Sequence, residues 1–480
     1  MPEWLMMRLP MITTAIFVCA VGACVGSLIN VLVYRMPRGL DVVKPTSRCP
    51  SCGTKLTWRE NIPILGWVLL GGKCRFCKVK ISPEYPIVET IVALLFGGAF
   101  MLWYMTPPDF TLLGMPLGSI APEWAANGAG RTWPAFLVLI TLLGSLVAMT
   151  IIDARTCTIP LVLCWIPAIV ALIAHVGHAV WIEAAFGPPR LIEPGLWSVG
   201  RYRWETATGE VWTLATGGLH NPRFVGVAIG ASAGLVVANM LIFWKLISRS
   251  FADYDEWEAT AVAEAQAQTQ IEAQAKATGP GQNATDPPTG PETESPDHAS
   301  PTDLWIQYPH ARREMVHELA FLAPVVVLGM LGGWIAGRLA GTAVIGPGGV
   351  AEPAAAMPLW LTVLGGVLMG YLIGGGIVWA ARIFGTVAFG KEAMGLGDVH
   401  LMGAVGASLG WIDPVIAFFG AAFVGVAWVI LAALARGRLN RAMPYGPFLA
   451  IATVLVIVLK PAIESGLGRL FSMGSPLDLP

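Results

Sequence analysis

Long apolar stretches constrain what this chain can fold into more than any other feature of its sequence. The hydrocarbon core of a bilayer, ~30 Å thick, needs about 20 apolar residues to cross it as an α-helix. Stretches of this kind lie at 11–34, 86–104, 134–152, 159–181, 223–247, 317–340, 358–382, 399–411, 414–434 and 446–465. The stretch at 399–411 is shorter and rich in glycine. The first stretch is too long for a secretion signal and has no obvious cleavage site, so we expect it to stay in the protein.

The composition also favours a membrane protein. Only 13% of the 480 residues are charged, about half of the ~25% usual in soluble domains. Hydrophobic residues make up 55%, which excludes a mostly disordered chain. The 30 Lys and Arg residues balance 31 Asp and Glu residues, so no basic excess favours nucleic acid as a partner. We predict an all-α polytopic membrane protein, a bundle of about 8–10 transmembrane helices in a lipid bilayer.

The loop after the first apolar stretch sets the predicted orientation. Cytoplasmic loops carry an excess of Lys and Arg, and Asp41 and Glu60 are nearly the only acids of this loop. Its basic residues are Arg35, Arg38, Lys44, Arg48, Lys55, Arg59, Lys73, Arg75, Lys78 and Lys80. The loop is therefore predicted to be cytoplasmic, with the N-terminus outside. Alternation of the spans places Arg436, Arg438 and Arg441 inside as well, and the segments near 105–133, 182–222 and 341–357 outside.

Four of the eight cysteines form two pairs in this basic loop. They are Cys49 and Cys52 and, after 21 intervening residues, Cys74 and Cys77. Two C-x-x-C pairs at such a separation are typical of a four-thiolate zinc site, and nearby Lys and Arg favour the thiolate form. Two disulfides or unconnected thiols are the alternatives, but a cytoplasmic loop lies in a reducing compartment, which argues against disulfides. We predict that the loop binds one zinc ion.

Two aspartates border apolar spans, where charges are costly and often functional. Asp153 ends the third span, and Asp398 follows the tripeptide Gly395-Leu396-Gly397. Both fall at the cytoplasmic ends of their spans in the predicted topology, so they could meet. One of two carboxyl groups that share a site keeps its proton and acts as an acid while the other activates water, as in aspartic peptide hydrolysis. Alternatively, Asp398 caps the following helix and Asp153 is a helix-end charge in interfacial water.

Four groups of motifs follow one another along the chain. The first is Gly26-Ser27-Leu28-Ile29-Asn30-Val31 with Tyr34-Arg35-Met36-Pro37. The second runs from Arg48-Cys49-Pro50-Ser51-Cys52 through Trp58, Asn61-Ile62-Pro63-Ile64 and Gly72-Lys73-Cys74-Arg75-Phe76-Cys77 to Ile81-Ser82-Pro83-Glu84-Tyr85-Pro86 and Glu89. The third is Asp153 with Ile159-Pro160, and the fourth is Gly395-Leu396-Gly397-Asp398-Val399 with Met443-Pro444-Tyr445-Gly446-Pro447-Phe448. With these motifs, over roughly 11–181 and 358–465, the chain resembles the type IV prepilin peptidases, membrane aspartic proteases of the GxGD type.

The resemblance implies an activity and a location. Such enzymes cut the short basic leader from prepilins and pseudopilins, after a glycine, at the cytoplasmic face of the bacterial plasma (inner) membrane. Many then methylate the new N-terminal amine with S-adenosylmethionine, and the zinc-binding loop is associated with this two-activity form. The resemblance makes Asp153 and Asp398 the catalytic acids, and Gly395 and Gly397 would let backbone and substrate come close. The possible substrate or methyl-transfer region would include Arg35, Asn61, Glu89 and His400.

The sequence departs from the family pattern at three places. Leu161 stands where the family often has Asp, and His400 stands where it usually has Lys. We expect His400 to be a polar residue beside the site. The third departure is an insert at 182–357, which adds a pair of spans and a stretch at 252–303. That stretch is rich in Ala, Gln, Thr, Pro and Glu, which predicts disorder.

We divide the chain into five parts on these grounds. They are the first transmembrane helix (1–34), the zinc-binding loop (35–85), the first part of the peptidase core (86–181), the insert (182–357) and the second part of the core (358–480). Two other classes of function stay open. One is a transporter whose aspartates relay protons, although transporter sites lie near the midplane of the bilayer. The other is a zinc-bearing membrane scaffold without catalysis.

Overall fold

The structure is a computed structural model that describes most of the chain. The described residues are 3–44, 47–49, 51–107, 109–112, 115–120, 125, 128–187, 190–193, 196–199, 202–205, 222–254, 308–339, 344–345, 351–352, 357–390, 392–436 and 444–470, with scattered positions between 256 and 267. Most of the stretch at 252–303, predicted to be disordered, lies outside these ranges. Arg438, Arg441 and Met443 lie outside them as well.

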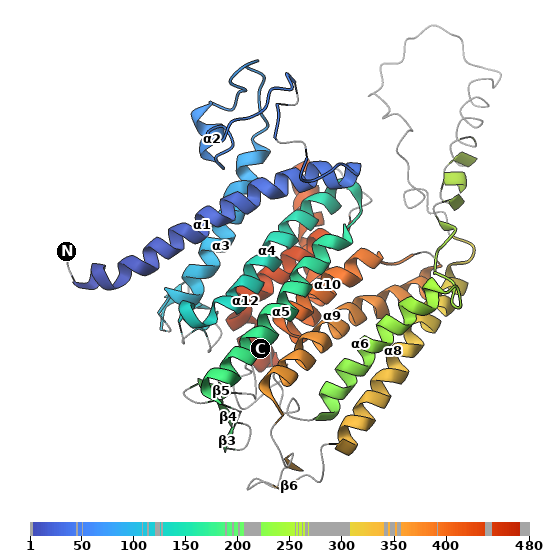
Figure 1. Ribbon diagram of the computed structural model, residues 1–480. Helices are drawn as coiled ribbons and strands as arrows, with labels where there is room; N and C mark the ends of the chain where they lie inside the picture. Colours follow the sequence, from blue (N-terminus) through green and yellow to red (C-terminus); the bar gives the residue numbers. More distant parts are fainter. Residues whose placement is uncertain are drawn as a thin grey trace, which may run out of the picture.

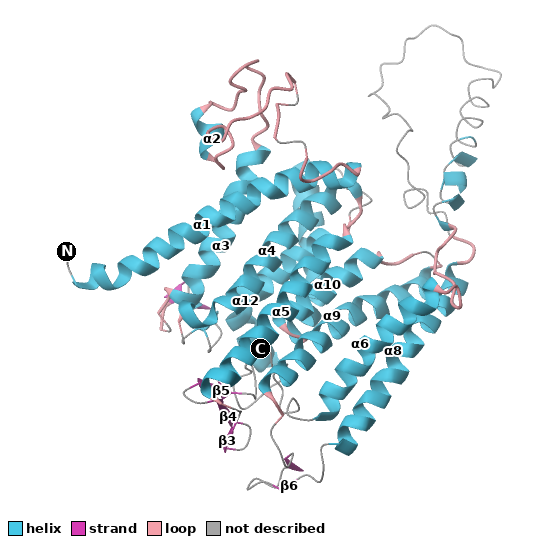
Figure 2. Cartoon of the chain, in the orientation of Figure 1, coloured by secondary structure: helices cyan, strands magenta, loops and turns pink. Residues whose placement is uncertain are grey.

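In the part of the chain that the structure describes, ten helices build the bundle, and each corresponds to one predicted apolar stretch (Figure 1). They are α1 (Glu3–Arg35), α3 (Glu84–Tyr104), α4 (Ala129–Thr156), α5 (Leu161–Phe186), α6 (Pro222–Phe243), α8 (Ala311–Leu339), α9 (Leu359–Phe389), α10 (Leu396–Leu409), α11 (Ile412–Arg436) and α12 (Gly446–Leu470). Within the described residues, eight of them are long and apolar enough to cross a membrane. Helices dominate the chain (Figure 2), so the predicted all-α polytopic membrane fold is confirmed.

Short elements occupy the connections between these helices. The loop after α1 holds a 3-10 turn (Met36–Arg38) and α2 (Leu65–Leu69), and a second 3-10 turn covers Leu117–Ile120. Among the described residues, antiparallel strands form three small sheets: β1 (Thr111–Leu112) with β2 (Met115–Pro116), β3 (Arg190–Glu193) with β4 (Leu196–Val199) and β5 (Tyr202–Glu205), and β6 (Val344–Ile345) with β7 (Ala351–Glu352). In the largest, Trp197 pairs with Trp204. All three sheets lie in loops predicted to face outside, and Figure 1 shows the labelled strands at the end of the bundle opposite α2.

Glycines bring the core helices into close contact, as is common where helices associate inside a bilayer. A side-chain carbon added to Gly26 of α1 would collide with the backbone of Glu89 in α3. Gly370 of α9 and Gly406 of α10 pack backbone against backbone in the same way. Residues 401–410 are all buried. At ~1.5 Å per residue the 14-residue α10 is roughly 21 Å long, too short to cross the hydrocarbon core by itself, so it is a core helix.

Helices α6 and α8 form a tight pair beside α9 (Figure 1). Gly226 and Gly230 lie one helical turn apart on α6. A side-chain carbon added to either would collide with a backbone carbonyl of α8, that of Gly332 or Leu328 respectively. Both helices come from the segment 182–357, so this segment contributes the extra helix pair that its apolar stretches predicted.

Candidate active site and metal centre

The cysteine loop folds into two matching turns, one for each cysteine pair. In each turn the amide of the first cysteine donates to the carbonyl five residues further on, at 3.0 Å for Cys49 and 2.9 Å for Cys74. The residue after the second cysteine is left-handed, with φ of 68° at Gly53 and 60° at Lys78. Its amide donates back to the carbonyl of the first cysteine, at 2.9 Å and 3.1 Å. Each turn therefore presents two sulfurs to the same side.

The two turns face each other and bring the four sulfurs together. The ligand atoms of Cys49, Cys52, Cys74 and Cys77 all lie within 4.8 Å of one another, and the Cys49 and Cys77 sulfurs are 3.8 Å apart. A tetrahedral ion with Zn–S bonds of ~2.3 Å separates its sulfurs by about 3.8 Å. All eight cysteines fall within the described ranges and none forms a disulfide. The donor set and its spacing fit zinc.

The local hydrogen bonds favour thiolate at Cys52 and Cys74, whereas burial and the neighbouring cysteine side chains raise the pKa of Cys77 to about 11. The Thr54 hydroxyl hydrogen-bonds the Cys52 sulfur at 3.3 Å, and together with the Thr54 amide it lowers the pKa of Cys52 to about 6. The backbone amides of Cys77 and Phe76 lower the pKa of Cys74. Thiolate is the form that binds a metal.

Contacts from α1 and α3 tie the cysteine loop to the membrane helices. The buried Glu89 carboxylate accepts a hydrogen bond of 2.6 Å from the amide of Ile64, which begins α2 in a left-handed conformation. The Asn30 amide donates to the Tyr85 carbonyl at 3.1 Å. Glu89, which the sequence motifs grouped with a substrate region, therefore anchors the cysteine loop to α3. Gly26 packs closely on the backbone of Glu89, which explains why the motif at 26–31 begins with glycine.

A cavity of about 330 Å³ lies between the end of α1 and the cysteine loop. Arg35, Lys55, Trp58 and Asn61 line part of it. The structure thus brings together Arg35 and Asn61, which sequence motifs assigned to one region, while Glu89 and His400 are not among the lining residues. Arg35 also donates to the backbone carbonyl of Val42 at 3.0 Å, which folds the start of the loop over the helix end.

Asp153 and Asp398 lie at helix ends on the same side of the bundle as the cysteine loop. Asp153 is near the end of α4 and only 4% exposed, and Asp398 is in the first turn of α10 and 8% exposed. Arg155, two residues after Asp153, forms an ion pair of 3.1 Å with Glu84 at the start of α3. Since α3 begins where the cysteine loop ends, this contact fixes the side of the bundle.

The two aspartates share a set of neighbours. A side-chain carbon added to Gly446, the first residue of α12, would collide with Oδ2 of Asp153 and touch Cδ1 of Ile159. One added to Gly397 would lie 2.8 Å from Cβ of the same Ile159. Asp153 and Asp398 also interact electrostatically. The connection after α4, the start of α10 and the start of α12 therefore converge on one small, largely buried site.

The start of α10 shows whether Asp398 caps this helix. Gly395 is the N-cap of α10, in an extended conformation, and no side chain caps the helix. The expectation that Asp398 caps this helix is wrong, because the helix begins two residues earlier at Leu396. Asp398 instead lies in the first turn, where the helix dipole stabilises a carboxylate, and its Oδ2 lies close to Gly395.

Parts of this chain are similar in sequence to known proteins of one family. Residues 20–103 match the Bacterial Peptidase A24 N-terminal domain. Proteins named "Prepilin leader peptidase/N-methyltransferase" are similar to this chain in three bacteria: Myxococcus xanthus, 50% identical over 133 residues, Vibrio cholerae, 38% over 106, and Pseudomonas aeruginosa, 33% over 165. The resemblance to type IV prepilin peptidases is confirmed.

These matches are partial. The match to the Myxococcus xanthus protein covers 27% of this chain and 40% of the relative. The match to the Vibrio cholerae protein covers 20% and 41%, and that to the Pseudomonas aeruginosa protein covers 30% and 48%. The chain thus spans less than half the length of these curated relatives. No solved structure gives a significant match.

His400, which stands where prepilin peptidases usually have Lys, faces away from the aspartates. It lies two residues after Asp398, so at ~100° per residue its side chain leaves α10 on nearly the opposite side. Its Nδ1 is 2.7 Å from the hydroxyl of Tyr371 on α9, and the ring of Trp165 packs edge-on against it. We therefore place His400 in the packing of α10 against α5 and α9, and not beside the carboxyl groups as its position in the sequence suggested.

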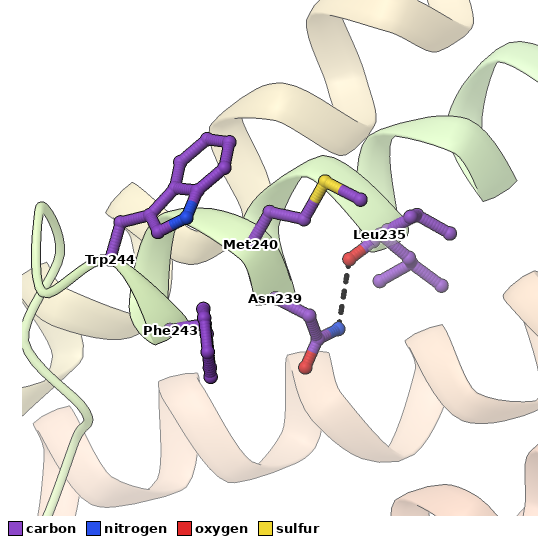
Figure 3. Close-up of a pocket in the computed structure, with 6 residues that line it drawn as sticks. Leu235, Asn239, Met240, Phe243 and Trp244 are labelled. Atoms are coloured by element: carbon purple, nitrogen blue, oxygen red, sulfur yellow. Dashed lines mark hydrogen bonds between the residues drawn. The ribbon is translucent and has the colours of Figure 1, made fainter.

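Another cavity, about 530 Å³, is lined by residues of α6 and its C-terminal end (Figure 3). Leu235, Met240, Phe243 and Trp244 give it an apolar lining. The polar side chain of Asn239 turns back to donate to the Leu235 carbonyl at 2.8 Å. Because these residues offer no acid, base or metal ligand, the cavity adds nothing to the chemistry of the aspartates.

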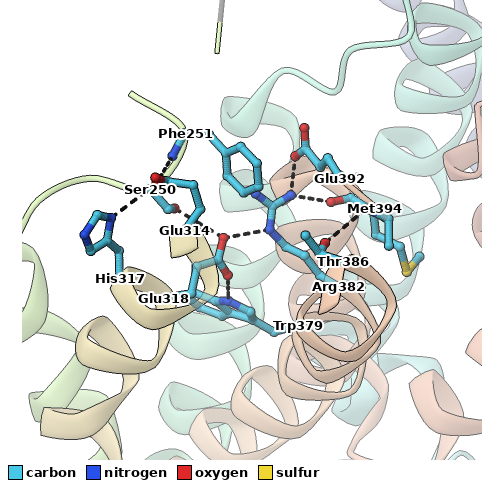
Figure 4. A network of polar contacts seen from close by, with 11 residues as sticks. Ser250, Phe251, Glu314, His317, Glu318, Trp379, Arg382, Thr386, Glu392 and Met394 are labelled. Carbon is cyan, nitrogen blue, oxygen red and sulfur yellow. Dashed lines mark hydrogen bonds and ion pairs between the residues drawn. The ribbon is translucent and has the colours of Figure 1, made fainter. Parts of the chain in front are cut away.

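Sequence motifs missed one group of buried polar residues beside the aspartate site. Arg382 of α9, 1% exposed, binds Glu318 of α8 at 2.8 Å and also binds Glu392 (Figure 4). The sequence did offer a signal: Arg382 and Glu318 each lie within a predicted apolar stretch, at its end and at its start, where a charge needs a partner. The two are 64 residues apart along the chain, and sequence patterns do not reveal that they pair.

Proposed function

We propose that this chain is a membrane aspartic endopeptidase that removes the basic leader of type IV prepilins or pseudopilins at the cytoplasmic face of the plasma membrane, and then methylates the new N-terminus. The convergence of Asp153 and Asp398 around Ile159 and Gly446 carries the peptidase half of this proposal. The names of the similar proteins support both halves.

The two carboxyl groups have complementary tasks in peptide hydrolysis. Two carboxyl groups that interact at one site do not both ionise easily, so one is protonated and the other is not. The ionised group takes a proton from a water molecule while the water oxygen attacks the scissile carbonyl carbon. The protonated group gives its proton to the carbonyl oxygen. When the tetrahedral intermediate collapses, the C–N bond breaks and a proton passes from the carboxyl pair to the leaving amine. One hydroxyl group of the intermediate returns a proton to the pair, which leaves a new carboxyl group on the product and one proton on the pair as before.

The depth of the site fits a prepilin substrate. A basic leader stays on the cytoplasmic side, and the apolar segment behind it lies in the bilayer. The bond between them is therefore at the membrane boundary. Asp153 and Asp398 lie at helix ends, on the side of the basic cysteine loop, which is the level at which such a bond would be presented.

We assign methyl transfer to the region around the cysteine loop. S-adenosylmethionine would supply an electrophilic methyl group to the new N-terminal amine. A cavity of about 330 Å³ falls within the ~300–1,000 Å³ typical of small-molecule sites. In it, Arg35 and Lys55 offer positive charge to a carboxylate, and Trp58 offers an aromatic face to a nucleobase. Zinc held by the four cysteines would order the walls of this cavity, because Lys55 and Trp58 follow the first cysteine pair directly.

The other two function classes have less support. A proton-relaying transporter is expected to place its acids near the midplane on broken helices, whereas Asp153 lies in the last turn of α4. A scaffold without catalysis differs from the enzyme only in activity.

Mass spectrometry of a co-expressed prepilin tests directly whether the chain is an enzyme: we expect loss of the leader and the added mass of one methyl group. An unprocessed prepilin beside a correctly inserted enzyme would contradict the proposed function.

Replacing Cys52 with serine is expected to release zinc and to impair methylation more than cleavage. Serine removes one of four thiolate ligands, and metal binding of this kind orders a small loop. Elemental analysis of the purified protein should find close to one zinc per chain in the wild type and much less in Cys52→Ser.

Cys24→Ser is the matched control for this substitution. Cys24 lies in α1 and is not part of the cluster, so this variant should keep zinc and both activities. Wild-type protein purified without chelators and free of zinc would contradict the assignment.

A further inference from the structure

Arg382 is a charged side chain buried almost completely near the end of α9, with 1% of its surface exposed. A charge in such a place is strongly destabilising unless it is paired and hydrogen-bonded. Its partners come from three other parts of the chain (Figure 4). Glu318 of α8 is one, and the Glu392 carboxylate and the Met394 carbonyl lie in the connection between α9 and α10. The third is Phe251, whose ring centre lies 5.0 Å from Cζ of Arg382.

Glu318 is as buried as its partner, with 2% exposed. Its Oε1 accepts a hydrogen bond of 2.8 Å from Nε of Arg382, and another of 3.2 Å from the Ser250 hydroxyl. Its Oε2 accepts a hydrogen bond from the indole of Trp379 on α9. Both Glu318 and Ser250 belong to the segment 182–357, so this segment neutralises a buried charge of the helix that leads to Asp398.

The guanidinium of Arg382 connects Glu318 to the residues just before α10. Nη1 of Arg382 donates to the Met394 carbonyl, and the neighbouring Ala393 amide donates to the Thr386 hydroxyl of α9 at 3.2 Å. Met394 directly precedes Gly395, the N-cap of α10. Asp398 follows in the first turn, close enough to Arg382 for the two charges to interact. A shift of Arg382 would therefore move or loosen the turn that carries Asp398.

We propose that Glu318 is a positioning residue of the aspartate site: it holds Arg382 in the orientation that fixes the turn 392–398. The segment 182–357 is then a structural part of the active site. This inference rests on the proposed function, since it assigns Asp398 a task that needs fixed geometry. A displacement of about 1 Å can lower a rate by ~10²-fold even when the changed residue is far from the chemistry.

Glu318→Ala is the test variant, read by two measurements on the full-length protein in detergent or nanodiscs. Hydrogen exchange should become faster at 392–398, and kcat for prepilin cleavage should fall by ~10²-fold with KM little changed. Glu318→Gln keeps an acceptor of the same size and should restore most of the activity, to within ~10-fold of the wild type, because only the charge assistance is lost.

Glu183→Ala is the matched control. Glu183 of α5 accepts a hydrogen bond of 3.1 Å from the Leu359 amide at the opposite end of α9, so exchange at 392–398 and kcat should stay at wild-type values. Deleting residues 260–300 should also leave both unchanged, because the deletion keeps Ser250 and Glu318.

The two measurements separate this inference from the proposed function. Wild-type kcat and wild-type exchange in Glu318→Ala would overturn the inference. A wild-type chain that cuts no prepilin would refute the proposed function, while the exchange rates would still decide whether Glu318 holds the turn. If Glu318→Ala is not inserted, Glu318→Met decides, because methionine fills the same space without a carboxylate acceptor for Arg382: faster exchange at 392–398 supports the inference, and wild-type exchange overturns it.

Discussion

Replacing either Asp153 or Asp398 with asparagine is expected to reduce prepilin cleavage by about 10³-fold or more, because general acid–base catalysis contributes up to ~10⁴-fold. Asparagine keeps the shape of aspartate but can neither take a proton from water nor give one to the substrate. The double variant should be no worse than either single variant, because residues that act as a unit are not additive. A quantitative cleavage assay on the three variants measures this.

Asp413→Asn is the matched control for these two substitutions. Asp413 is also a buried acid in the first turn of a helix, 7% exposed, but it follows the opposite end of α10. This variant should retain wild-type cleavage. Membrane insertion of all variants should stay near normal, which a protease-accessibility assay can check. Robust cleavage by Asp153→Asn or Asp398→Asn would remove that residue from the mechanism.

Local patterns sufficed for the elements of the fold and for the identity of the candidate acids. Hydropathy located all ten helices, because an apolar run has to be helical in a bilayer. It underestimated several lengths: α9 continues to Phe389 beyond the predicted end at 382, since a helix does not stop where the hydrocarbon does. The paired C-x-x-C spacing predicted the sulfur cluster because both turns are short and local.

Contacts between distant segments were beyond sequence patterns. Glu89 was grouped with a substrate region, yet it accepts a hydrogen bond from Ile64. His400 was expected beside the aspartates, yet it pairs with Tyr371 of another helix. The Glu318–Arg382 pair joins two helices whose relative placement depends on packing over the whole bundle. Such pairings depend on which helix faces are adjacent, and periodicity along one helix does not determine that.

Gly446→Ala is expected to lower kcat for cleavage by ~10²-fold while leaving KM and stability nearly unchanged. A methyl group at this position would collide with Oδ2 of Asp153 and lie 3.0 Å from Cδ1 of Ile159. The carboxyl group of Asp153 would have to leave its present position. Gly446 begins α12 without a left-handed φ, so alanine introduces no backbone strain. Alanine is a better helix former than glycine, so a lower rate would come from the displaced acid and not from an unfolded helix.

Gly466→Ala, on the same helix, separates the two effects. A side-chain carbon added to Gly466 would meet nothing within 4 Å, so this variant gains the same helix propensity without touching the site. Steady-state cleavage kinetics and thermal unfolding of both variants then distinguish the explanations. Equal kcat in Gly446→Ala and Gly466→Ala would mean that Asp153 does not need its present orientation. A lower melting temperature in Gly446→Ala alone would mean that the collision is relieved by movement of α12, and not by rotation of the carboxyl group.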